Sequence, residues 1–431
     1  MSFGSKAALE TAVQIAEWLC HTAYQCQGLC NWMGTTQQAD EDSEALEIAY
    51  ETLGPDLYGG TSGVSLFLAE TYAHTNDPRY RDIAEGAVRH ALSQAHGIPR
   101  EDRFGFYHGR VGVAYAATRI AGLLDRPGLL DLLSDTLTPL FGGLDETVSL
   151  DVISGAAGAA PALLHLADRL KRPDLAALAR ALGDRMISTA NRSSEGWSWG
   201  GLATESEPAR GLTGFAHGAA GFGWSLLELW RYSSEARFLE AARHAFAYEN
   251  HWFQHGQDNW SDLRDWDPSD GPAPCGLAWC HGAPGIGLSR LRALELQDDA
   301  QCRRDAEAAA RAAKRALTDA DRQHELGFSL CHGLAGIADF LLLAAVALPD
   351  PDARRVAWET AAAGAARYAG RPANWPCGLA RGSTPSLMTG LAGIGYFYLR
   401  LADPTVPSVL LVTPTRSGPL PDHRKGSRAR R

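Results

Sequence analysis

Two segments of the chain place a cysteine and a histidine directly before a Gly-x-x-Gly motif. The first is WCHGAPG, with Cys280 and His281, and the second is LCHGLAG, with Cys331 and His332. Thiolate and imidazole groups together favour zinc, and three protein ligands leave a fourth tetrahedral position open for a substrate. Cys280, Cys331 and His332 are therefore candidate zinc ligands, whereas His281 or His217 would close the coordination of a structural ion. The alternative is that both cysteines are inert core thiols.

The Gly-x-x-Gly motif recurs along the chain, each time at the start of a small or apolar run. Its first glycines are Gly60, Gly109, Gly155, Gly218, Gly282, Gly333 and Gly390. Successive first glycines are 49, 46, 63, 64, 51 and 57 residues apart, which leaves room for two helices in each unit. Amphipathic stretches such as PRYRDIAEGAVRHALSQA lie between the motifs. We predict an all-α fold in which each unit has a glycine-led inner helix and a more polar outer helix.

The ends of the repeat array favour a closed ring. An open array needs polar capping repeats, but the first and last units carry the same apolar motif as the others. In a ring, equivalent positions lie at the same end of the barrel. The residues directly before the first glycines are Gly59, His108, Ser154, His217, His281, His332 and Thr389, and those one position earlier are Tyr58, Tyr107, Ile153, Ala216, Cys280, Cys331 and Met388. This register lets the two cysteines converge across 51 residues and predicts His108 at the rim.

Four motifs of the chain, WCHGAPGIG, CHGLAG, DVISGAAG and FAHGAAG, together resemble the lanthionine synthetase cyclase (LanC-like) family. The similarity extends from about Leu57 to Pro414, and it is greatest to the cyclase domain of class II lanthipeptide synthetases. The resemblance implies an α/α toroid, a double ring of seven inner and seven outer helices with a zinc site at one end. The roughly fifty residues before this region read as another helix pair rather than a dehydratase domain, so the sequence is either a free-standing cyclase of class II type or an excised domain. We expect the dehydratase partner to be a separate enzyme.

The resemblance also implies the metal ligands. The zinc ligands of the family match Cys280, Cys331 and His332, which makes Zn²⁺ the expected cofactor. The residue after the first of these ligands is His281, as in the class II type. Some class I members have an arginine four residues before that ligand, and Gly276 stands there in this chain.

The chemistry of thioether formation assigns roles to further residues. A peptide thiol must add across the double bond of dehydroalanine or dehydrobutyrine, and a free thiol with a pKa of ~8.5 is only partly ionised at neutral pH. The addition generates an enolate whose α-carbon must receive a proton. His217, which matches an acid/base histidine of the family, is the first candidate donor, and His281 is the second. Asp151, which matches a family aspartate, orients His217 or the peptide amide, or else caps the following helix.

The leading functional hypothesis is a zinc-dependent cyclase that makes lanthionine or methyllanthionine rings in a dehydrated, ribosomally made precursor peptide. Two alternatives stay open: addition of glutathione to dehydrated residues in proteins, and a non-catalytic LanC-like partner of a dehydratase. A glycan-processing enzyme on a similar barrel would need paired carboxylates at its mouth. The glycine-led positions offer mainly Asp151.

Composition and charge exclude several other classes of protein. The 431 residues are 45% hydrophobic and 21% charged, as in globular proteins. A net charge of -10 argues against a nucleic-acid surface. No stretch of ~18 consecutive apolar residues indicates a membrane span, and no secretory signal is evident, so we expect a cytoplasmic protein. Eight cysteines are too few for a disulfide scaffold of this length.

The domain organisation follows from the repeats. We predict one LanC-like domain over residues 1–415 and a basic, disordered tail over residues 416–431, which includes the run RKGSRARR. Residues 251–271 and 196–211 each precede a motif of the candidate site, and we expect both segments to lie over the mouth of the barrel.

Overall fold

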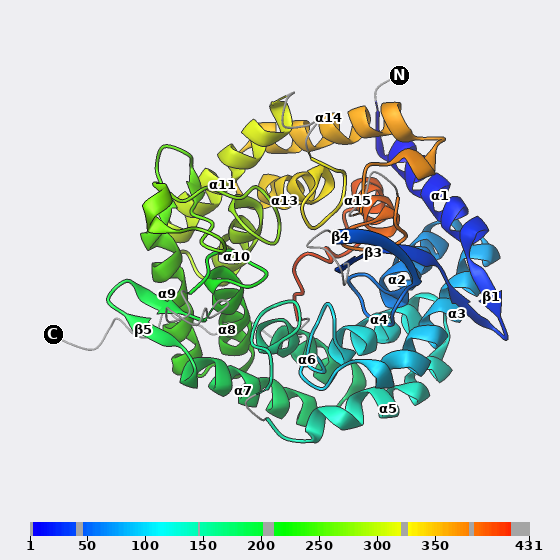
Figure 1. Ribbon diagram of the computed structural model, residues 1–431, viewed down its shortest axis with the longest axis horizontal. Coiled ribbons are helices and arrows are strands. Elements are labelled where there is room, and N and C mark those ends of the chain that lie inside the picture. Colours follow the sequence, from blue (N-terminus) through cyan, green and yellow to red (C-terminus); the bar gives the residue numbers. More distant parts are fainter. Residues whose placement is uncertain are drawn as a thin grey trace.

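The computed structural model describes residues 3–39, 46–144, 147–200, 211–319, 326–378 and 383–414. Within these residues the helices form two concentric rings (Figure 1). The inner ring contains seven helices: α2 (Thr61–Thr75), α4 (Arg110–Leu123), α6 (Ala156–Leu170), α8 (Ala219–Ser233), α10 (Ala283–Leu296), α13 (Leu334–Ala347) and α15 (Leu391–Ala402). The outer ring contains α1 (Ser5–Thr22), α3 (Pro78–Gln94), α5 (Leu133–Leu137), α7 (Pro173–Ser188), α9 (Ala236–His251), α11 (Ala300–Thr318) and α14 (Pro351–Tyr368). The predicted double ring is confirmed.

Each inner helix begins directly after the first glycine of a repeat motif, as the sequence predicts. Neighbouring inner helices pack side by side, and most are backed by the outer helix that follows them in the chain. The inner helices bury side chains all round because they face both the lumen and the outer ring. The outer helices are amphipathic: α11, for example, buries a stripe of alanines and exposes arginines.

Glycine is required where the loops before the inner helices double back on themselves. A Cβ atom on Gly285 would overlap the carbonyl oxygen of Trp279, and one on Gly336 would overlap that of Leu330. Gly282 has a φ of +102°, a backbone conformation that side chains with a Cβ rarely adopt. These positions fold the two Cys-His loops tightly against the ends of their own helices.

The N-terminal region differs from the sequence prediction. Of the first fifty residues, those that the structure describes (3–39 and 46–50) form one helix, α1, followed by two antiparallel hairpins rather than a second helix. The hairpins are β1 (Tyr24–Cys26) with β2 (Leu29–Asn31), and β3 (Met33–Ala39) with β4 (Leu46–Thr52). The prediction of a helix pair was wrong for the second element, where the sequence LEIAYET of β4 alternates between larger and charged or small residues, a two-residue period that suits a strand.

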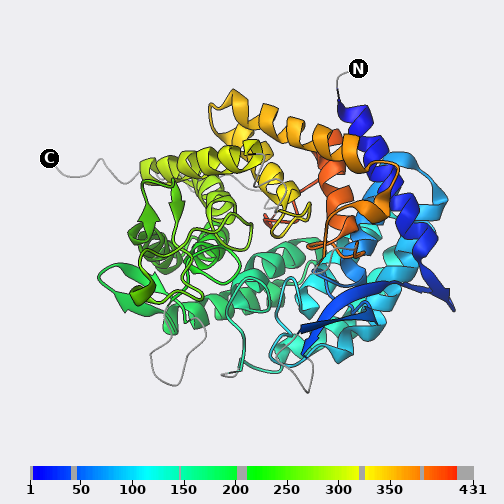
Figure 2. The same ribbon diagram turned by 45° about the horizontal axis from the view of Figure 1, so that its top comes forward.

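Helix α1 completes the last unit of the ring. No outer helix follows α15 within the described residues, and α1 packs against α15 in that place (Figure 2). The inner ring itself closes through contacts between α15 and α2. The two ends of the described chain therefore meet in one helix pair, which fastens the ring.

One outer helix is much shorter than the others. Helix α5 spans five residues and is flanked by two 3₁₀ helices, Pro127–Leu132 and Thr138–Phe141. Pro127 and Pro139 each lie near the start of one of these segments, where a proline is tolerated but a continuous α-helix is interrupted. The remaining strands form two small hairpins in the outer loops: β5 (Asn191–Ser193) with β6 (Gly196–Ser198), and β7 (Phe253–Gln254) with β8 (Asn259–Trp260).

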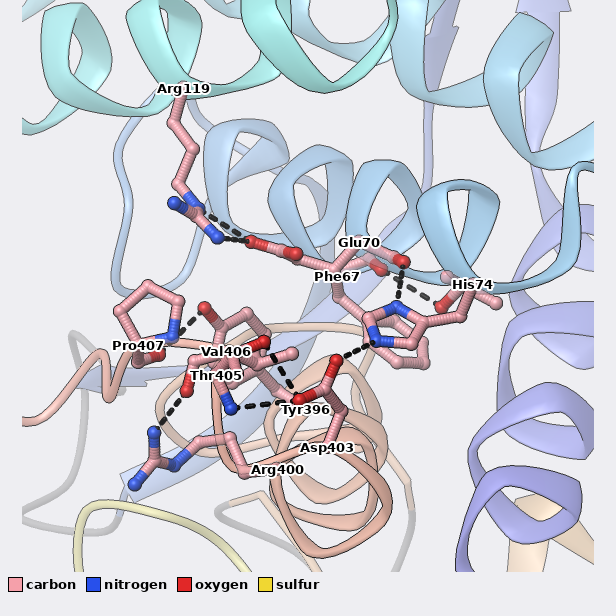
Figure 3. A network of polar contacts seen from close by, with 11 residues as sticks. Phe67, Glu70, His74, Arg119, Tyr396, Arg400, Asp403, Thr405, Val406 and Pro407 are labelled. Carbon is pink, nitrogen blue, oxygen red and sulfur yellow. Dashed lines mark hydrogen bonds and ion pairs between the residues drawn. The ribbon is translucent and has the colours of Figure 1, made fainter. Parts of the chain in front are cut away.

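Charged side chains recur deep in the inner ring, ten residues after the first glycine of a unit. Arg119 of α4 forms an ion pair with Glu70 of α2 (Figure 3). In the same way, Arg292 of α10 pairs with Glu228 of α8, with Nε to Oε1 at 2.5 Å. Arg400 of α15, also ten residues after its first glycine, forms a buried pair with Asp339 of α13, which lies six residues after Gly333. Each pair joins two neighbouring inner helices, so the repeat register is also seen away from the mouth.

A histidine and an aspartate link the first and last inner helices. His74 Nδ1 donates to the Glu70 carbonyl oxygen at 2.8 Å, and its Nε2 lies 3.1 Å from Asp403 Oδ2 (Figure 3). His74 lies in the last turn of α2, and Asp403 follows α15. This pair lies at the C-terminal ends of the inner helices, the opposite end of the barrel from the glycine motifs.

The segment after α15 runs into the lumen of the inner ring (Figure 1). Val409 and Leu410 are buried there, and two aromatic side chains bind their carbonyl oxygens: Tyr107 Oη donates to Val409 at 2.8 Å, and Trp279 Nε1 donates to Leu410 at 2.9 Å. The predicted tail, residues 416–431, lies outside the described residues. Among those described, no helix combines the length and apolar character that a bilayer crossing requires.

Candidate functional site

The carbonyl oxygens of the residues two positions before the first glycines accept a belt of backbone hydrogen bonds around one end of the barrel. In each case a carbonyl oxygen of one loop accepts an N–H from a neighbouring loop. The bonds are Tyr58 N to Tyr107 O (3.0 Å), Tyr107 N to Ile153 O (3.0 Å), Val152 N to Ala216 O (2.9 Å), Ala216 N to Cys280 O (3.0 Å), Trp279 N to Cys331 O (2.9 Å), Cys331 N to Met388 O (2.8 Å) and Met388 N to Tyr58 O (2.9 Å). The belt closes on itself, so it holds seven equivalent positions at one level of the mouth.

Cys280 and Cys331 are neighbours in this belt, and their thiols form a hydrogen bond. That bond, together with the positive charge of Arg264, lowers the pKa of Cys280 although the thiol is largely shielded from water. The bond to Cys280 and burial raise the pKa of Cys331 well above its usual range. Cys280 is therefore the more acidic of the two thiols.

The chemistry of this sulfur pair fits a zinc ion, which binds thiolates. The third predicted ligand, His332, has an exposed side chain next to Cys331 in the chain. Over the described ranges, no three histidine, cysteine, aspartate or glutamate side chains are already placed to share one metal ion. The structure thus brings two of the three predicted ligands together, Cys280 and Cys331, and it does not place His332 with them.

His217 and Asp151 form a second cluster at the mouth. His217 Nδ1 lies 2.6 Å from Asp151 Oδ2, and the other carboxylate oxygen accepts the N–H of Ser154 at 2.8 Å. Asp151 thus contacts His217 and also accepts a hydrogen bond in the turn before α6. It does not cap α6 itself, because the N-cap residue is Gly155 and no side chain caps this helix. Burial works to lower the pKa of His217, but the hydrogen bond and charge of Asp151 outweigh it, and the net pKa is raised. The only ring nitrogen left for other contacts is Nε2.

His281 lies beside His217 but in a different environment. It is 3% exposed, and its ring stacks on that of His217 at 5.6 Å between centroids. Burial and the nearby charge of Arg264 lower the pKa of His281 to about 4. His281 is therefore neutral near pH 7, whereas His217 is the imidazole that favours the protonated form.

Arg264 is a residue of this site that the sequence reasoning missed. It forms a two-point ion pair with Asp262, with Nε to Oδ1 at 3.0 Å and Nη2 to Oδ2 at 2.7 Å. Its charge acts on Cys280, His217 and His281. The segment 251–271 therefore does reach the mouth, as expected, and it brings a cation to a site whose class I arginine position is a glycine. The Asp-x-Arg spacing in this loop was the available signal. Most of the other expected mouth segment, residues 201–210, lies outside the described residues.

Tyr58 and His108 extend the site on the other side of the cysteines. The Tyr58 hydroxyl donates a hydrogen bond to the Cys331 sulfur, and its ring meets that of His108 edge-on at 5.0 Å. His108 is exposed at the rim, and its Nδ1 lies 3.4 Å from Ser154 Oγ. Sequence reasoning placed His108 at the rim but gave no role to Tyr58, although Tyr58 occupies the same register as the cysteines.

Comparison with known proteins bears on this arrangement. A family described as lanthionine synthetase C-like protein matches residues 51–411. The chain belongs to this family. The lacticin 481/lactococcin biosynthesis protein LcnDR2 of Lactococcus lactis subsp. lactis is 22% identical to this lanthionine synthetase C-like protein over 316 residues, which cover 71% of this chain and 31% of that protein. The chain thus spans about a third of the length of this relative.

A solved structure shares the fold of this lanthionine synthetase C-like protein. Nisin cyclase superimposes with a TM-score of 0.60 at 20% sequence identity, and the match covers 80% of this chain and 91% of that chain. The helical toroid is therefore common to both proteins.

Proposed function

We propose that this chain is a zinc-dependent cyclase that adds cysteine thiols of a dehydrated precursor peptide to dehydroalanine or dehydrobutyrine residues of the same peptide. The observation that carries the proposal is the meeting, at one mouth, of the Cys280–Cys331 pair with the hydrogen-bonded pair of His217 and Asp151. Membership in the lanthionine synthetase C-like family and the biosynthetic role named for LcnDR2 support the same substrate class. A separate dehydratase would supply the dehydrated peptide.

The zinc ion would be held by Cys280, Cys331 and, after rotation of its side chain, His332. When bound, the ion supplies a positive charge that lowers the pKa of a substrate thiol and keeps its sulfur as a thiolate. The thiol proton leaves to solvent in this step, and the sulfur is then ready to form a bond to carbon.

His217 has the properties that the second half of the reaction requires. As the new carbon–sulfur bond forms, the electrons of the carbon–carbon double bond move toward the carbonyl and give an enolate. The α-carbon of this enolate takes a proton from His217 Nε2, and solvent returns a proton to the imidazole. Asp151 supports this step because it fixes Nδ1, raises the pKa of His217 and stabilises the imidazolium form. Overall no atoms are gained or lost.

The neighbouring imidazole suits a different role. A pKa of about 4 leaves His281 unprotonated at neutral pH, so it is a poor donor for the enolate. Its stacking on His217 favours a packing role that keeps the His217 ring in place. These features favour His217 over His281 as the proton donor.

The proposal is tested with a synthetic peptide that contains one cysteine and one dehydroalanine. Cyclisation leaves the mass unchanged, so unreacted thiol is trapped by alkylation and counted by mass spectrometry. We expect the parent protein to protect the thiol and His217→Ala to leave it alkylatable while zinc content stays the same. If the parent never protects the peptide but joins added glutathione to it, the chain adds glutathione instead. If it does neither, the catalytic proposal is refuted.

A further inference from the structure

A buried carboxylate from the outer ring reaches the loop that carries His217. Glu249 lies near the end of α9 and is 0% exposed. Its Oε1 accepts the N–H of Gly214 at 2.9 Å and the N–H of Ala220 at 2.7 Å. His217 lies midway between these two amides. One carboxylate oxygen therefore ties both ends of the segment that presents the imidazole.

The position of this segment determines how His217 faces the cysteine pair. Gly214 has a φ of +101°, and a Cβ atom added to it would lie 3.1 Å from the Cys280 carbonyl oxygen. Two residues further on, the Ala216 N–H binds that same carbonyl oxygen at 3.0 Å. The loop is thus held against the Cys280 loop on one face and by Glu249 on the other. A shift of the segment would change the distance between His217 and the sulfurs.

The environment of Glu249 disfavours the charged form of its carboxylate. Burial raises its pKa to about 7, although the charge of Arg290 and the two N–H groups act in the opposite direction. Arg290 forms its own ion pair with Asp305, with Nε to Oδ2 at 3.0 Å. The second oxygen, Oε2, has no hydrogen-bond partner among the described residues. A buried carboxylate without a direct ion pair is destabilising, and an apolar side chain of similar size would avoid that cost.

We propose that Glu249 is a positioning residue for His217, which holds the segment 214–220 so that the imidazole faces the substrate bound at the cysteine pair. This inference rests on the proposed role of His217 as proton donor. Glu249 does not touch the reacting atoms, because its carboxylate lies behind the loop in the core. It acts only through the hydrogen bonds that it accepts from the Gly214 and Ala220 N–H groups. The proposed role therefore requires a hydrogen-bond acceptor at this point and does not require a negative charge.

The variants follow from that distinction. Glu249→Ala removes the acceptor, whereas Glu249→Gln keeps an oxygen that can accept both N–H groups. Glu228→Ala is the matched control, because Glu228 is equally buried but pairs with Arg292 and does not touch the loop. If Glu249→Ala does not fold, Glu249→Asp replaces it, since its carboxylate is one methylene too short to reach both amides.

Two readouts separate positioning from general destabilisation. Hydrogen exchange followed by mass spectrometry over residues 214–220 needs no substrate, and we expect faster exchange there in Glu249→Ala but not in Glu249→Gln or Glu228→Ala. In the cyclisation assay we expect Glu249→Ala to lower kcat by roughly tenfold to a hundredfold with little change in KM, because a misplacement of ~1 Å can cost ~10²-fold. Glu249→Gln should restore kcat.

Three results would overturn the proposal. Unchanged exchange over residues 214–220 in a folded Glu249→Ala protein would show that the carboxylate does not hold the loop. An equal loss of kcat in the Gln and Ala variants would show that the acceptor bonds are not what matters. Faster exchange with unchanged kcat would show that the loop position is irrelevant to the reaction. If the parent protein lacks cyclase activity, the exchange data still test whether Glu249 anchors the loop. Failure of the proposed function is therefore distinguished from failure of the proposed role of Glu249.

Discussion

Replacing Asp151 by asparagine tests the proton-donor assignment most directly. The amide oxygen of asparagine can still accept the Ser154 N–H, so the turn before α6 should persist. The amide N–H₂ group, however, would face His217 Nδ1 where a carboxylate oxygen now lies at 2.6 Å. The imidazole must then present Nδ1 as an acceptor, which disfavours the protonated ring. Burial remains, so we expect the pKa of His217 to fall from its raised value to below the ordinary one.

The size of the effect follows from the bond that is lost. Hydrogen bonds to charged groups contribute about 1.5–3 kcal/mol, and the lower end applies because solvent screens a partly exposed pair. The His217 side chain is 41% exposed, so we expect a loss of about 1.5 kcal/mol, which is roughly tenfold in rate. The loss should grow with pH, because a lower pKa leaves less imidazolium at neutral and alkaline pH.

The assay is the alkylation experiment with the one-ring peptide, repeated from pH 6 to pH 9. Asp403→Asn is the matched control, because Asp403 Oδ2 lies 3.1 Å from His74 Nε2 in an equivalent pair at the opposite end of the barrel. We expect it to leave the rate profile unchanged. An Asp151→Asn protein with the parent's rate at every pH would refute the assignment of His217 as the donor.

The same pair also contributes to stability. A histidine whose pKa is raised on folding stabilises the folded state fully below its unfolded pKa of ~6.5, and that contribution is lost as the pH rises through the folded pKa. Asp151→Asn removes the raising interaction. The unfolding free energy of the variant, measured with urea at pH 6 and pH 8, should therefore fall less between these two values than that of the parent.

Three further predictions concern the metal, the thiolate and the buried carboxylate. Cys331→Ala should lose most of the zinc found by elemental analysis, whereas Cys302→Ala, a buried thiol of the outer ring, should keep it; equal zinc in both would exclude the sulfur pair as ligands. Arg264→Gln should raise the pKa of Cys280, so the metal-free variant should react more slowly with iodoacetamide at pH 7 than the metal-free parent. An unchanged reaction rate would show that the charge of Arg264 does not act on the Cys280 thiol. Because the pKa of Glu249 is raised to about 7, the contribution of this residue to stability is complete below pH ~4.5 and is lost as the pH rises through 7. Glu249→Gln should therefore reduce the fall in unfolding free energy over this pH range by up to ~3 kcal/mol, as measured by urea titration. If the unfolding free energies of variant and parent fall in parallel with pH, the prediction is contradicted.

The ring and its register could be predicted from the sequence because both depend on local features. Each first glycine marks the start of an inner helix, and each second glycine leaves space for a carbonyl oxygen of its own loop. Repetition of one local structure then places Cys280 and Cys331 at the same level, since the backbone belt joins equivalent residues. A pattern that repeats in sequence carries its geometry from one unit to the next.

The closure of the ring could not be predicted in the same way. The apolar stripe of α1 indicates a helix with one buried face, but it does not say which helix covers that face. Its partner, α15, lies more than 350 residues away in the chain. The hairpins after α1 lie outside the glycine-led repeats. The helical periodicity of those repeats therefore does not apply to them, and a helix pair was predicted in their place.

Two of the three residues that sequence reasoning missed lie outside the glycine register. Arg264 lies in a loop between two units and Glu249 lies on an outer helix, so the glycine motif defines neither position. Their relation to His217 depends on how the loop and the outer helix fold over the mouth. Tyr58 shares the register of the cysteines, but a tyrosine has many structural uses, and only its contact with Cys331 distinguishes this one.

The filled lumen limits how a peptide can use this mouth. Tyr107 belongs to the same backbone belt as the cysteine pair, and Trp279 directly precedes Cys280. Both side chains donate hydrogen bonds to carbonyl oxygens of the buried segment that contains Val409 and Leu410. Within the described residues, this segment therefore occupies part of the lumen next to the site. Under the proposed function, we expect the substrate to enter as a bend and leave by the same opening, with its thiol and its dehydrated residue both approaching from one side. A site of this shape constrains only the two reacting residues, so the length of peptide between them is free to loop into solvent.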